Sequence, residues 1–234
     1  MRLNEPITDC EVLVPEDLLG AMNDVERKNA PAKLYAAGDR SVFDAGPRVA
    51  VVGSRRASDD GLKRARLLAR ELVKHGMVVV SGLAEGIDTA AHESAIQDGG
   101  RSIAVLGTPL DQCFPIQNRA LQDQMMREQL VVSQFSSGTP SGAKNFPIRN
   151  RTMALLSDAT VIVEAGEKSG TLHQGWEALR LGRLLFLLES VANDRELTWP
   201  AEMIRYGAQV LSRKNLKTVL ENIPQRPTRE KVPF

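Results

Sequence analysis

Short apolar runs alternate with amphipathic segments over most of this chain, and this alternation is the strongest constraint on its fold. Six apolar runs occupy residues 48–52, 77–80, 102–106, 130–133, 159–163 and 184–188, and a further short strand is predicted at 33–37. Segments with helical periodicity occupy residues 62–74, 87–97, 118–127, 150–156 and 172–181. Continuously apolar strands that alternate with helices are typical of a parallel sheet covered on both faces. Because such crossovers are right-handed, we predict a doubly wound, mostly parallel α/β fold.

The alternation starts near residue 46 and divides the chain into three predicted parts. Residues 1–45 form an N-terminal extension that we expect to pack on the core. Residues 46–212 contain the alternating strands and helices and form the main domain. Residues 213–234 form a basic, proline-containing tail that we expect to be partly flexible and to lose regular structure past residue 222.

Composition excludes several classes of protein. The 234 residues include 30 basic and 29 acidic side chains, so the net charge of +1 gives no indication of a nucleic-acid partner. No apolar stretch approaches the roughly 20 residues that span a bilayer, and the N-terminus lacks the apolar core of a signal peptide. The two cysteines, Cys10 and Cys113, and the three histidines have no metal-site spacing. We therefore expect a cytoplasmic protein without membrane contact, metal or other cofactor.

Glycine and hydroxyl residues follow four of the predicted strands. These positions are Gly53, Ser54, Arg55 and Arg56; Ser81 and Gly82; Gly107 and Thr108; and Gly166, Lys168, Ser169, Gly170 and Thr171. Glycine allows close approach of the backbone to a ligand, and the helix starts that follow attract anions. One such loop alone would be ordinary turn chemistry, but four at the carboxyl edge of a sheet predict a site for phosphate groups. Neither a dinucleotide-binding GxGxxG fingerprint nor a GxxxxGK[ST] loop is present.

A second candidate segment, Lys144-Asn145-Phe146-Pro147-Ile-Arg149-Asn-Arg151, places basic side chains beside an aromatic ring. Because Pro147 disfavours helical backbone at Phe146, we expect the following helix to begin near residue 150. The basic side chains suit a phosphodiester, and the phenyl ring suits an unstacked base.

A simpler alternative places Phe146 in the core and pairs the two arginines with Asp158 or Glu164. Asp88 and His92 lie four residues apart on one predicted helix. They are consistent either with a general-base pair or, more simply, with an ion pair or hydrogen bond within the helix.

Taken together, these motifs resemble the DprA/Smf family of DNA-processing proteins. The resemblance runs in order from about residue 33 to 188 and rests on Val52–Arg55, Ser81–Asp88 with His92, Ala104–Thr108, Asn145–Arg151 and Glu164–Leu172. It implies an extended Rossmann-like fold, a homodimer, and binding of single-stranded DNA without catalysis. It also implies loading of a RecA-type recombinase in DNA uptake and recombination during natural transformation. The DNA pocket of the family maps onto Gly53, Ser54, Arg55, Lys144, Phe146, Arg149 and Arg151.

The resemblance has departures. The family often carries an N-terminal helical domain and a C-terminal winged helix; we expect a short form with the core alone. Residues 189–200 also differ from the proline-glycine turn that is usual in the family. The alternatives are a nucleotide sensor and an enzyme of the related LOG type, which cleaves nucleoside monophosphates. Gln174 stands where the LOG enzymes have a catalytic glutamate, and a glutamine amide cannot act as a general base.

Overall fold

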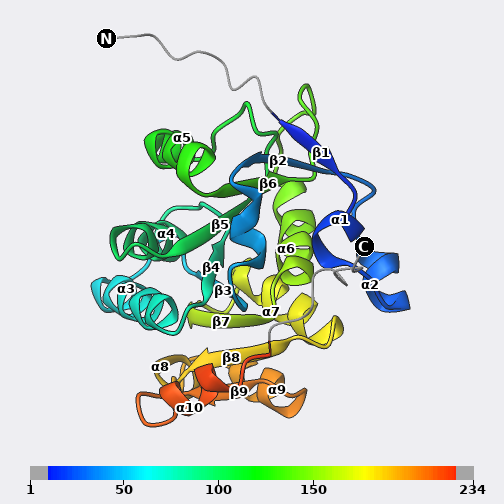
Figure 1. Cartoon of the computed structure of the whole chain (residues 1–234). Helices are drawn as coiled ribbons and strands as arrows, with labels where there is room; N and C mark the ends of the chain where they lie inside the picture. The colour runs from blue at the N-terminus through cyan, green and yellow to red at the C-terminus, as the bar shows by residue number, and fades with distance from the viewer. Residues whose placement is uncertain (1–9, 225–234) are drawn as a thin grey trace.

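The computed structural model describes residues 10–224, and one nine-stranded sheet runs through that part of the chain (Figure 1). The strand order is β1-β2-β6-β5-β4-β3-β7-β8-β9. The strands are β1 (Glu11–Leu13), β2 (Leu34–Gly38), β3 (Arg48–Gly53), β4 (Val78–Ser81), β5 (Arg101–Leu106), β6 (Leu130–Ser133), β7 (Ala159–Glu164), β8 (Leu184–Leu188) and β9 (Gln209–Leu211). Strands β3 to β9 pair in parallel, whereas β1 and β2 pair antiparallel. The predicted mostly parallel α/β fold is confirmed, and the six main apolar runs are β3 to β8.

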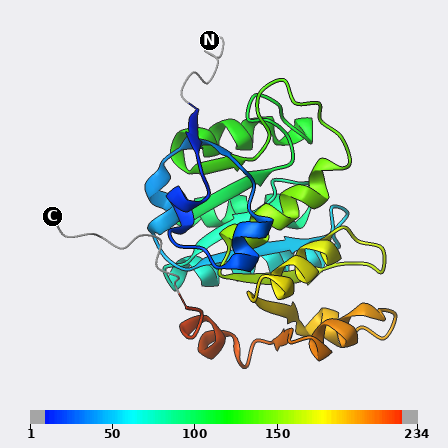
Figure 2. The same cartoon turned by 90° about the vertical axis from the view of Figure 1, so that its right-hand side faces the viewer.

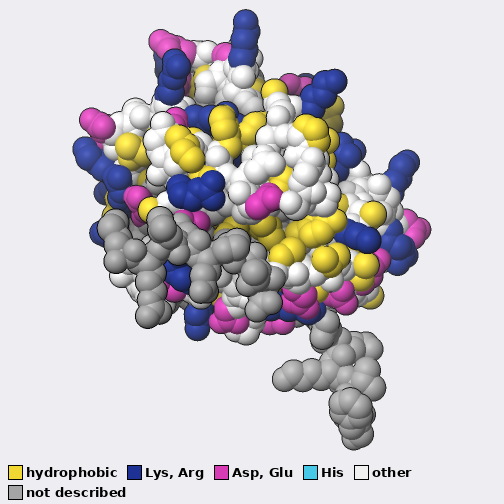
Figure 3. Space-filling model, turned by 90° about the horizontal axis from the view of Figure 1, so that it is seen from above, with side chains coloured by type: hydrophobic (Ala, Val, Ile, Leu, Met, Phe, Trp, Pro, Cys, Tyr) yellow, Lys and Arg dark blue, Asp and Glu magenta, His cyan; other side chains and the backbone are white. Residues whose placement is uncertain are grey.

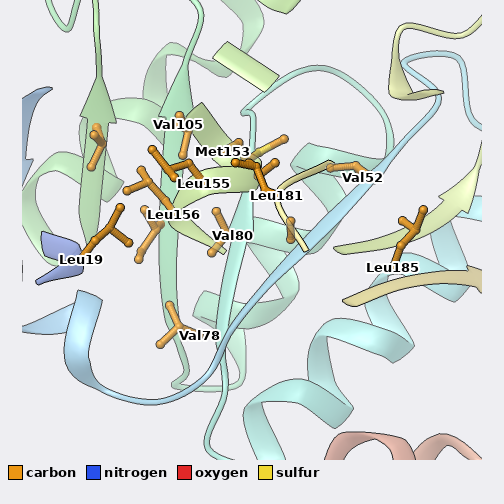
Figure 4. Packing of buried hydrophobic residues seen from close by; sticks show 14 of the residues in the cluster. Leu19, Val52, Val78, Val80, Val105, Met153, Leu155, Leu156, Leu181 and Leu185 are labelled. Atoms are coloured by element: carbon orange, nitrogen blue, oxygen red, sulfur yellow. The ribbon is translucent and has the colours of Figure 1, made fainter. Parts of the chain in front are cut away.

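Helices cover both faces of this sheet. They are α1 (Glu16–Leu19), α2 (Asp24–Asn29), α3 (Asp59–Lys74), α4 (Ile87–Gln97), α5 (Arg119–Glu128), α6 (Asn145–Leu156), α7 (Thr171–Arg180), α8 (Glu189–Ala192), α9 (Trp199–Arg205) and α10 (Leu216–Glu221), with 3₁₀ turns η1 (Arg40–Asp44) and η2 (Ile116–Asn118). Alternate residues of β3 divide between the faces: Val49 and Val51 pack with α3 and α4, whereas Ala50 and Val52 pack with α6 and the N-terminal elements. Figure 4 shows the second layer, in which Met153, Leu155 and Leu156 of α6 lie over the strands.

The order of the strands reverses between β3 and β7. From β3 the chain proceeds outward through β4, β5 and β6 in one direction, and it then returns to place β7 on the other side of β3. In a doubly wound sheet, ligands bind beyond the carboxyl ends of the strands at such a reversal. We therefore expect a ligand site at the loops that follow Gly53 and Glu164.

A buried ion pair joins β3 to the start of β7. The backbone nitrogen, Nε and Nη2 of Arg48 all donate to the carboxylate of Asp158, at 2.8, 3.0 and 3.0 Å. The guanidinium also lies 4.2 Å from the ring centroid of Phe43. This pair lies at the amino ends of the strands, opposite the predicted ligand-binding edge.

The structure corrects the predicted start of one helix. Helix α6 begins at Asn145, so Phe146 is helical and the prediction of a start near residue 150 was wrong. Pro147 falls in the first turn, where a backbone N–H has no partner within the helix and its loss costs little.

Segments near both ends of the chain add elements that the sequence patterns did not predict. Strand β1 extends one edge of the sheet, and β9 extends the other beside β8. In Figures 1 and 2 the C-terminal elements α9, β9 and α10, drawn in orange to red, lie along this second edge. The departure at residues 189–200 forms α8 and the start of α9. The expected loss of structure past residue 222 concerns mainly residues 225–234, which lie outside the described range.

Within the described residues, no helix combines the length and apolar character needed to cross a bilayer. On the face seen in Figure 3, lysine and arginine side chains are interspersed with acidic and hydrophobic ones. Any attraction for an anionic ligand must therefore come from local arrangement rather than from net charge.

Candidate functional site: a cleft at the carboxyl ends of β3 and β7

A cleft of about 570 Å³ opens where the strand order reverses. The predicted site residues that line it are Gly53, Ser54, Arg55, Arg56, Phe146, Arg149, Gly166, Lys168, Ser169, Gly170 and Thr171. They come from the loops after β3 and β7 and from the first two turns of α6. The parallel sheet therefore brings together, at the carboxyl ends of its strands, two loops that are more than 100 residues apart in sequence.

The loop after β7 offers the cleft an anion-binding surface. Space is open within 4 Å of where Cβ atoms would stand on Gly166 and Gly170. Helix α7 begins at Thr171, and its N-cap residue is Gly170, which has no side chain to cap the helix. The N–H groups of Thr171 and Leu172 donate to the Ser169 hydroxyl and carbonyl, at 3.2 and 3.1 Å, so the helix dipole is what favours an anion at this start. The Thr171 hydroxyl donates to the Gly53 carbonyl at 3.0 Å, which ties this loop to the loop after β3.

Two of the predicted glycines make room for protein side chains. A Cβ atom on Gly82 would lie 1.9 Å from Nη1 of Arg149, and one on Gly107 would lie 2.7 Å from Cδ1 of Phe146. Both clashes would displace residues of the cleft wall. These glycines therefore position the arginine and the ring, a role that the loop pattern did not distinguish from ligand contact.

Two predicted hydroxyl groups are engaged within the protein. Ser81 is buried and donates to the Val51 carbonyl at 2.7 Å. Thr108 donates to the Gln112 carbonyl at 3.1 Å. Neither residue is part of the cleft lining, so both act as supports of the loops.

Arg149 is the most buried cation of the cleft, with 4% of its surface exposed. Its Nη1 donates to the carbonyls of Gly82 and Val105, and its Nε donates to Oδ1 of Asn150 at 3.0 Å. Burial lowers the pKa of Arg149, and the nearby Asp88 carboxylate counteracts that shift. Burial likewise raises the pKa of Asp88, against the opposing effect of Arg149. The arginine thus joins the ends of β4 and β5 while it lines the cleft.

The other basic side chains of the α6 segment lie differently. Lys144 and Asn145 stand at the start of the helix, outside the cleft lining. Arg151 is directed to Glu177 of α7, with Nε 3.4 Å from the carboxylate. The sequence also suggested Asp158 or Glu164 as ion-pair partners of the two arginines. In the structure Asp158 accepts hydrogen bonds from Arg48, and Glu164 accepts from Ser58 and Arg64.

The ring of Phe146 is half-buried at the mouth of the cleft and lies near two cations. The guanidinium carbon of Arg55 is 4.8 Å from the ring centroid, and that of Arg149 is 5.9 Å from it. These distances are within the range of cation–π attraction. The ring of Phe114 lies 5.5 Å away at an angle of 48°. Sequence reasoning missed Phe114, although an aromatic-proline pair in the long loop after the third strand was a visible signal.

Asp88 and His92 face different partners on helix α4. Asp88 accepts hydrogen bonds from the backbone nitrogens of Gly82 and Ala84, at 3.1 and 3.4 Å. His92 Nδ1 is 2.7 Å from the Ser102 hydroxyl. Within the described part of the chain no hydrogen bond joins the two side chains, so neither the general-base pair nor the simple intrahelical bond describes them. Asp88 instead holds the loop after β4.

Burial lowers the pKa of His92 from its usual value near 6.5 to about 3. The folded protein therefore binds fewer protons at this site than the unfolded chain between these two values. The contribution of neutral His92 to the free energy of unfolding is fully present above about pH 6.5 and is lost as the pH falls toward 3. At pH 5 we expect a loss of about 2 kcal/mol in the free energy of unfolding from this group.

Urea unfolding at several pH values measures this effect. A His92→Gln variant should show a shallower dependence of stability on pH between 6.5 and 5, whatever its absolute stability. An unchanged slope in this variant would assign the acid sensitivity to other groups.

The cleft lining offers groups that can hold an anion and an aromatic base. Among the residues that the structure describes, no three histidine, cysteine or acidic side chains gather as a metal site. Gln174 is buried and lines the cleft. The arrangement combines a helix start, guanidinium groups and an aromatic ring.

Comparisons with known proteins converge on one group. The family model for DNA recombination-mediator protein A matches residues 15–224. Protein Smf of Synechocystis is 41% identical over 179 residues, which are 76% of this chain and 45% of that protein. DNA processing protein DprA of Bacillus subtilis is 31% identical over 204 residues, covering 87% of this chain and 68% of that protein. The Streptococcus pneumoniae protein is 38% identical over 184 residues, covering 79% and 64%. The chain thus spans between about half and two thirds of these relatives.

Solved structures show the same relationship. DNA processing protein A from Streptococcus pneumoniae superposes with a TM-score of 0.77 at 31% identity, over 94% of this chain and 76% of that one. The Helicobacter pylori protein, described for its single-stranded DNA binding mode, gives a TM-score of 0.74 at 27% identity over 91% and 94%. A molybdenum cofactor binding protein from Rippkaea orientalis, at 20% identity and a TM-score of 0.54 over 76% and 97%, shares the fold alone.

Proposed function

Because this chain belongs to the DprA/Smf family of DNA-processing proteins, we propose that it binds single-stranded DNA, without catalysis, in the cleft at the carboxyl ends of β3 and β7. The observation that carries the proposal is the position of Phe146. A half-buried aromatic ring at the mouth of a polar cleft, with Arg55 4.8 Å from its centroid, suits a base beside its phosphate.

The remaining parts of the cleft supply phosphate contacts in this proposal. The start of α7 and the open loop at Gly166 and Gly170 receive one phosphate group. Arg55, Arg56 and Lys168 are exposed at the rim and reach the next ones. Arg149 adds a buried positive charge behind the ring. Lys144 extends the basic surface along the start of α6, outside the cleft itself.

We extend the proposal from the family relationship to the role of the complex. The chain forms a homodimer in the cytoplasm and transfers single-stranded DNA to a RecA-type recombinase. Analytical ultracentrifugation tests whether the chain is a homodimer. Transfer of DNA to the recombinase is tested by the rate of recombinase filament formation on DNA that is already coated by single-strand binding protein. A rate that this chain does not increase would contradict the transfer.

Fluorescence anisotropy of a labelled thymidine oligonucleotide at two salt concentrations tests the binding proposal. We expect affinity that falls steeply with salt, because each phosphate contact contributes a slope of about −0.7 for single strands. Duplex DNA and mononucleotides should compete poorly. The cleft volume of about 570 Å³ is also suited to a single nucleotide. No binding of the oligonucleotide, with a mononucleotide raising the melting temperature, would favour the nucleotide sensor or enzyme instead.

Replacing the ring tests its role in stacking. Phe146→Ala should weaken binding of single strands by about 1–3 kcal/mol, as loss of one base–aromatic stack does. Binding of duplex DNA, whose bases are not available for stacking, should change little. Leu67→Ala, an exposed apolar residue on α3 outside the cleft, serves as the matched control. An equal loss for single strands and duplex, accompanied by a lower melting temperature, would mean that the ring supports the fold.

A further inference from the structure

We propose that Phe114 is a second base-stacking position, which takes the base next to the one at Phe146. The DNA strand then leaves the cleft across the loop between β5 and α5. This inference rests on the proposed function and adds to it a path for the strand, because it names the side of the cleft toward which the bound DNA continues.

The exposure of Phe114 is the first observation. Its surface is 53% exposed, and that of Ile116, two residues on, is 65% exposed. The ring centroids of Phe114 and Phe146 are 5.5 Å apart, so the two rings are in direct contact and no base enters between them. The outward side of Phe114 remains for a ligand. Two adjoining rings thus form a continuous aromatic surface that starts at the cleft and runs out of it.

A small hollow connects this ring to the cleft. It measures about 70 Å³ and is lined by Arg55, Gly82, Ala84, Glu85, Phe114, Pro115 and Phe146. Arg55 and Phe146 belong to both the hollow and the cleft. The arginine is therefore placed to reach the phosphate that links two successive nucleotides. Glu85 is the acid in this lining, and its charge disfavours a phosphate there, which leaves the uncharged base as the group that fits.

The loop that carries Phe114 is held in place by hydrogen bonds. Nδ2 of Asn118 donates to the Leu83 carbonyl and to Oγ1 of Thr89, both at 2.9 Å. Nε2 of Gln122 donates to the carbonyls of Leu110 and Gln112, both at 3.1 Å. These bonds anchor the loop on both sides of the ring. The ring is accordingly presented outward by a fixed loop, so that stacking requires little additional ordering.

The test compares two neighbouring apolar side chains of the same loop. Phe114→Ala should weaken binding of a 20-residue thymidine oligonucleotide by about 5- to 150-fold, the range expected for one stacked base. Phe114→Trp should retain binding. Ile116→Ala, at a position that is also exposed but not aromatic, should remain within about twofold of the unmodified protein. Tryptophan fluorescence of Phe114→Trp, after subtraction of the signal of the unmodified protein, should be quenched by the oligonucleotide.

The outcomes separate the two proposals. If the unmodified protein binds the oligonucleotide and Phe114→Ala binds it equally well, the second stacking position is wrong and the proposed function stands. A similar loss in Phe114→Ala and Ile116→Ala, without quenching in Phe114→Trp, would identify the loop as an apolar contact for a protein partner instead. Failure of the unmodified protein to bind any single strand would overturn both proposals.

Discussion

Arg149→Ala should lower the free energy of unfolding by about 1–3 kcal/mol, the cost of leaving buried hydrogen-bonding groups without a partner. The substitution leaves the Asp88 carboxylate buried without its neighbouring cation, and it leaves the carbonyls of Gly82 and Val105 without the donor Nη1. It also creates an empty space at the ends of β4 and β5. Affinity for single-stranded DNA should fall as well, because the ring of Phe146 loses a cation 5.9 Å from its centroid.

Urea unfolding and anisotropy together measure this result. Arg56→Ala is the matched control, because this arginine lines the same cleft but is exposed. It should change stability by less than about 0.5 kcal/mol while it weakens DNA binding. Arg149→Lys should recover only part of the loss, since an ammonium group cannot reproduce the fixed donor geometry of the guanidinium. An Arg149→Ala protein as stable as the unmodified one would contradict a structural role for this side chain.

Asp158→Ala should cost more stability, about 3–5 kcal/mol, for a reason unconnected with the ligand. Arg48 and Asp158 have 1% and 0% of their side-chain surfaces exposed, and removal of the carboxylate leaves a buried guanidinium without its charge partner. The same carboxylate accepts the backbone N–H of Arg48, so the first pairing of β3 with β7 is weakened too.

Two comparisons separate this pair from ordinary surface charge. Asp60→Ala breaks an exposed ion pair with Lys63 and should cost less than about 1 kcal/mol. Replacement of both Arg48 and Asp158 by apolar residues should restore much of the loss. Because the pair lies at the amino ends of the strands, the folded fraction of Asp158→Ala should bind DNA as the unmodified protein does. A loss of affinity in that fraction would show coupling between the two ends of the sheet.

The patterns of the sequence predicted the central part of the fold well, for a physical reason. Strands β3 to β8 are buried on both faces, so each is a short, continuously apolar run whose pattern differs from the periodic pattern of the amphipathic helices. Strands β1 and β9 have no comparable signal. Each has three residues and exists because the neighbouring strand offers an unpaired edge. The start of α6 was predicted too late, because a rule for the residue before proline was applied where the first turn of a helix tolerates proline.

Some features of the candidate site could likewise be predicted from the sequence, and others could not. Glycine after strands, together with the rule for carboxyl edges, predicted many of the residues that line the cleft. The sequence could not show that Gly82 and Gly107 serve neighbouring side chains, because the neighbours, Arg149 and Phe146, lie about 67 and 39 residues further along the chain. Nor could it separate the buried Arg149 from the outward Arg151, two residues apart on one helix.

By itself, the sequence determined the parallel sheet, the edge at which the cleft opens, and the family, because these depend on local composition and on the order of motifs. Only the tertiary structure decided which cation is buried, which glycine makes room for which side chain, and that Phe114 adjoins Phe146. These facts depend on contacts between segments far apart in sequence. Periodicity reports which face of an element is apolar, but it carries no information about what that face meets.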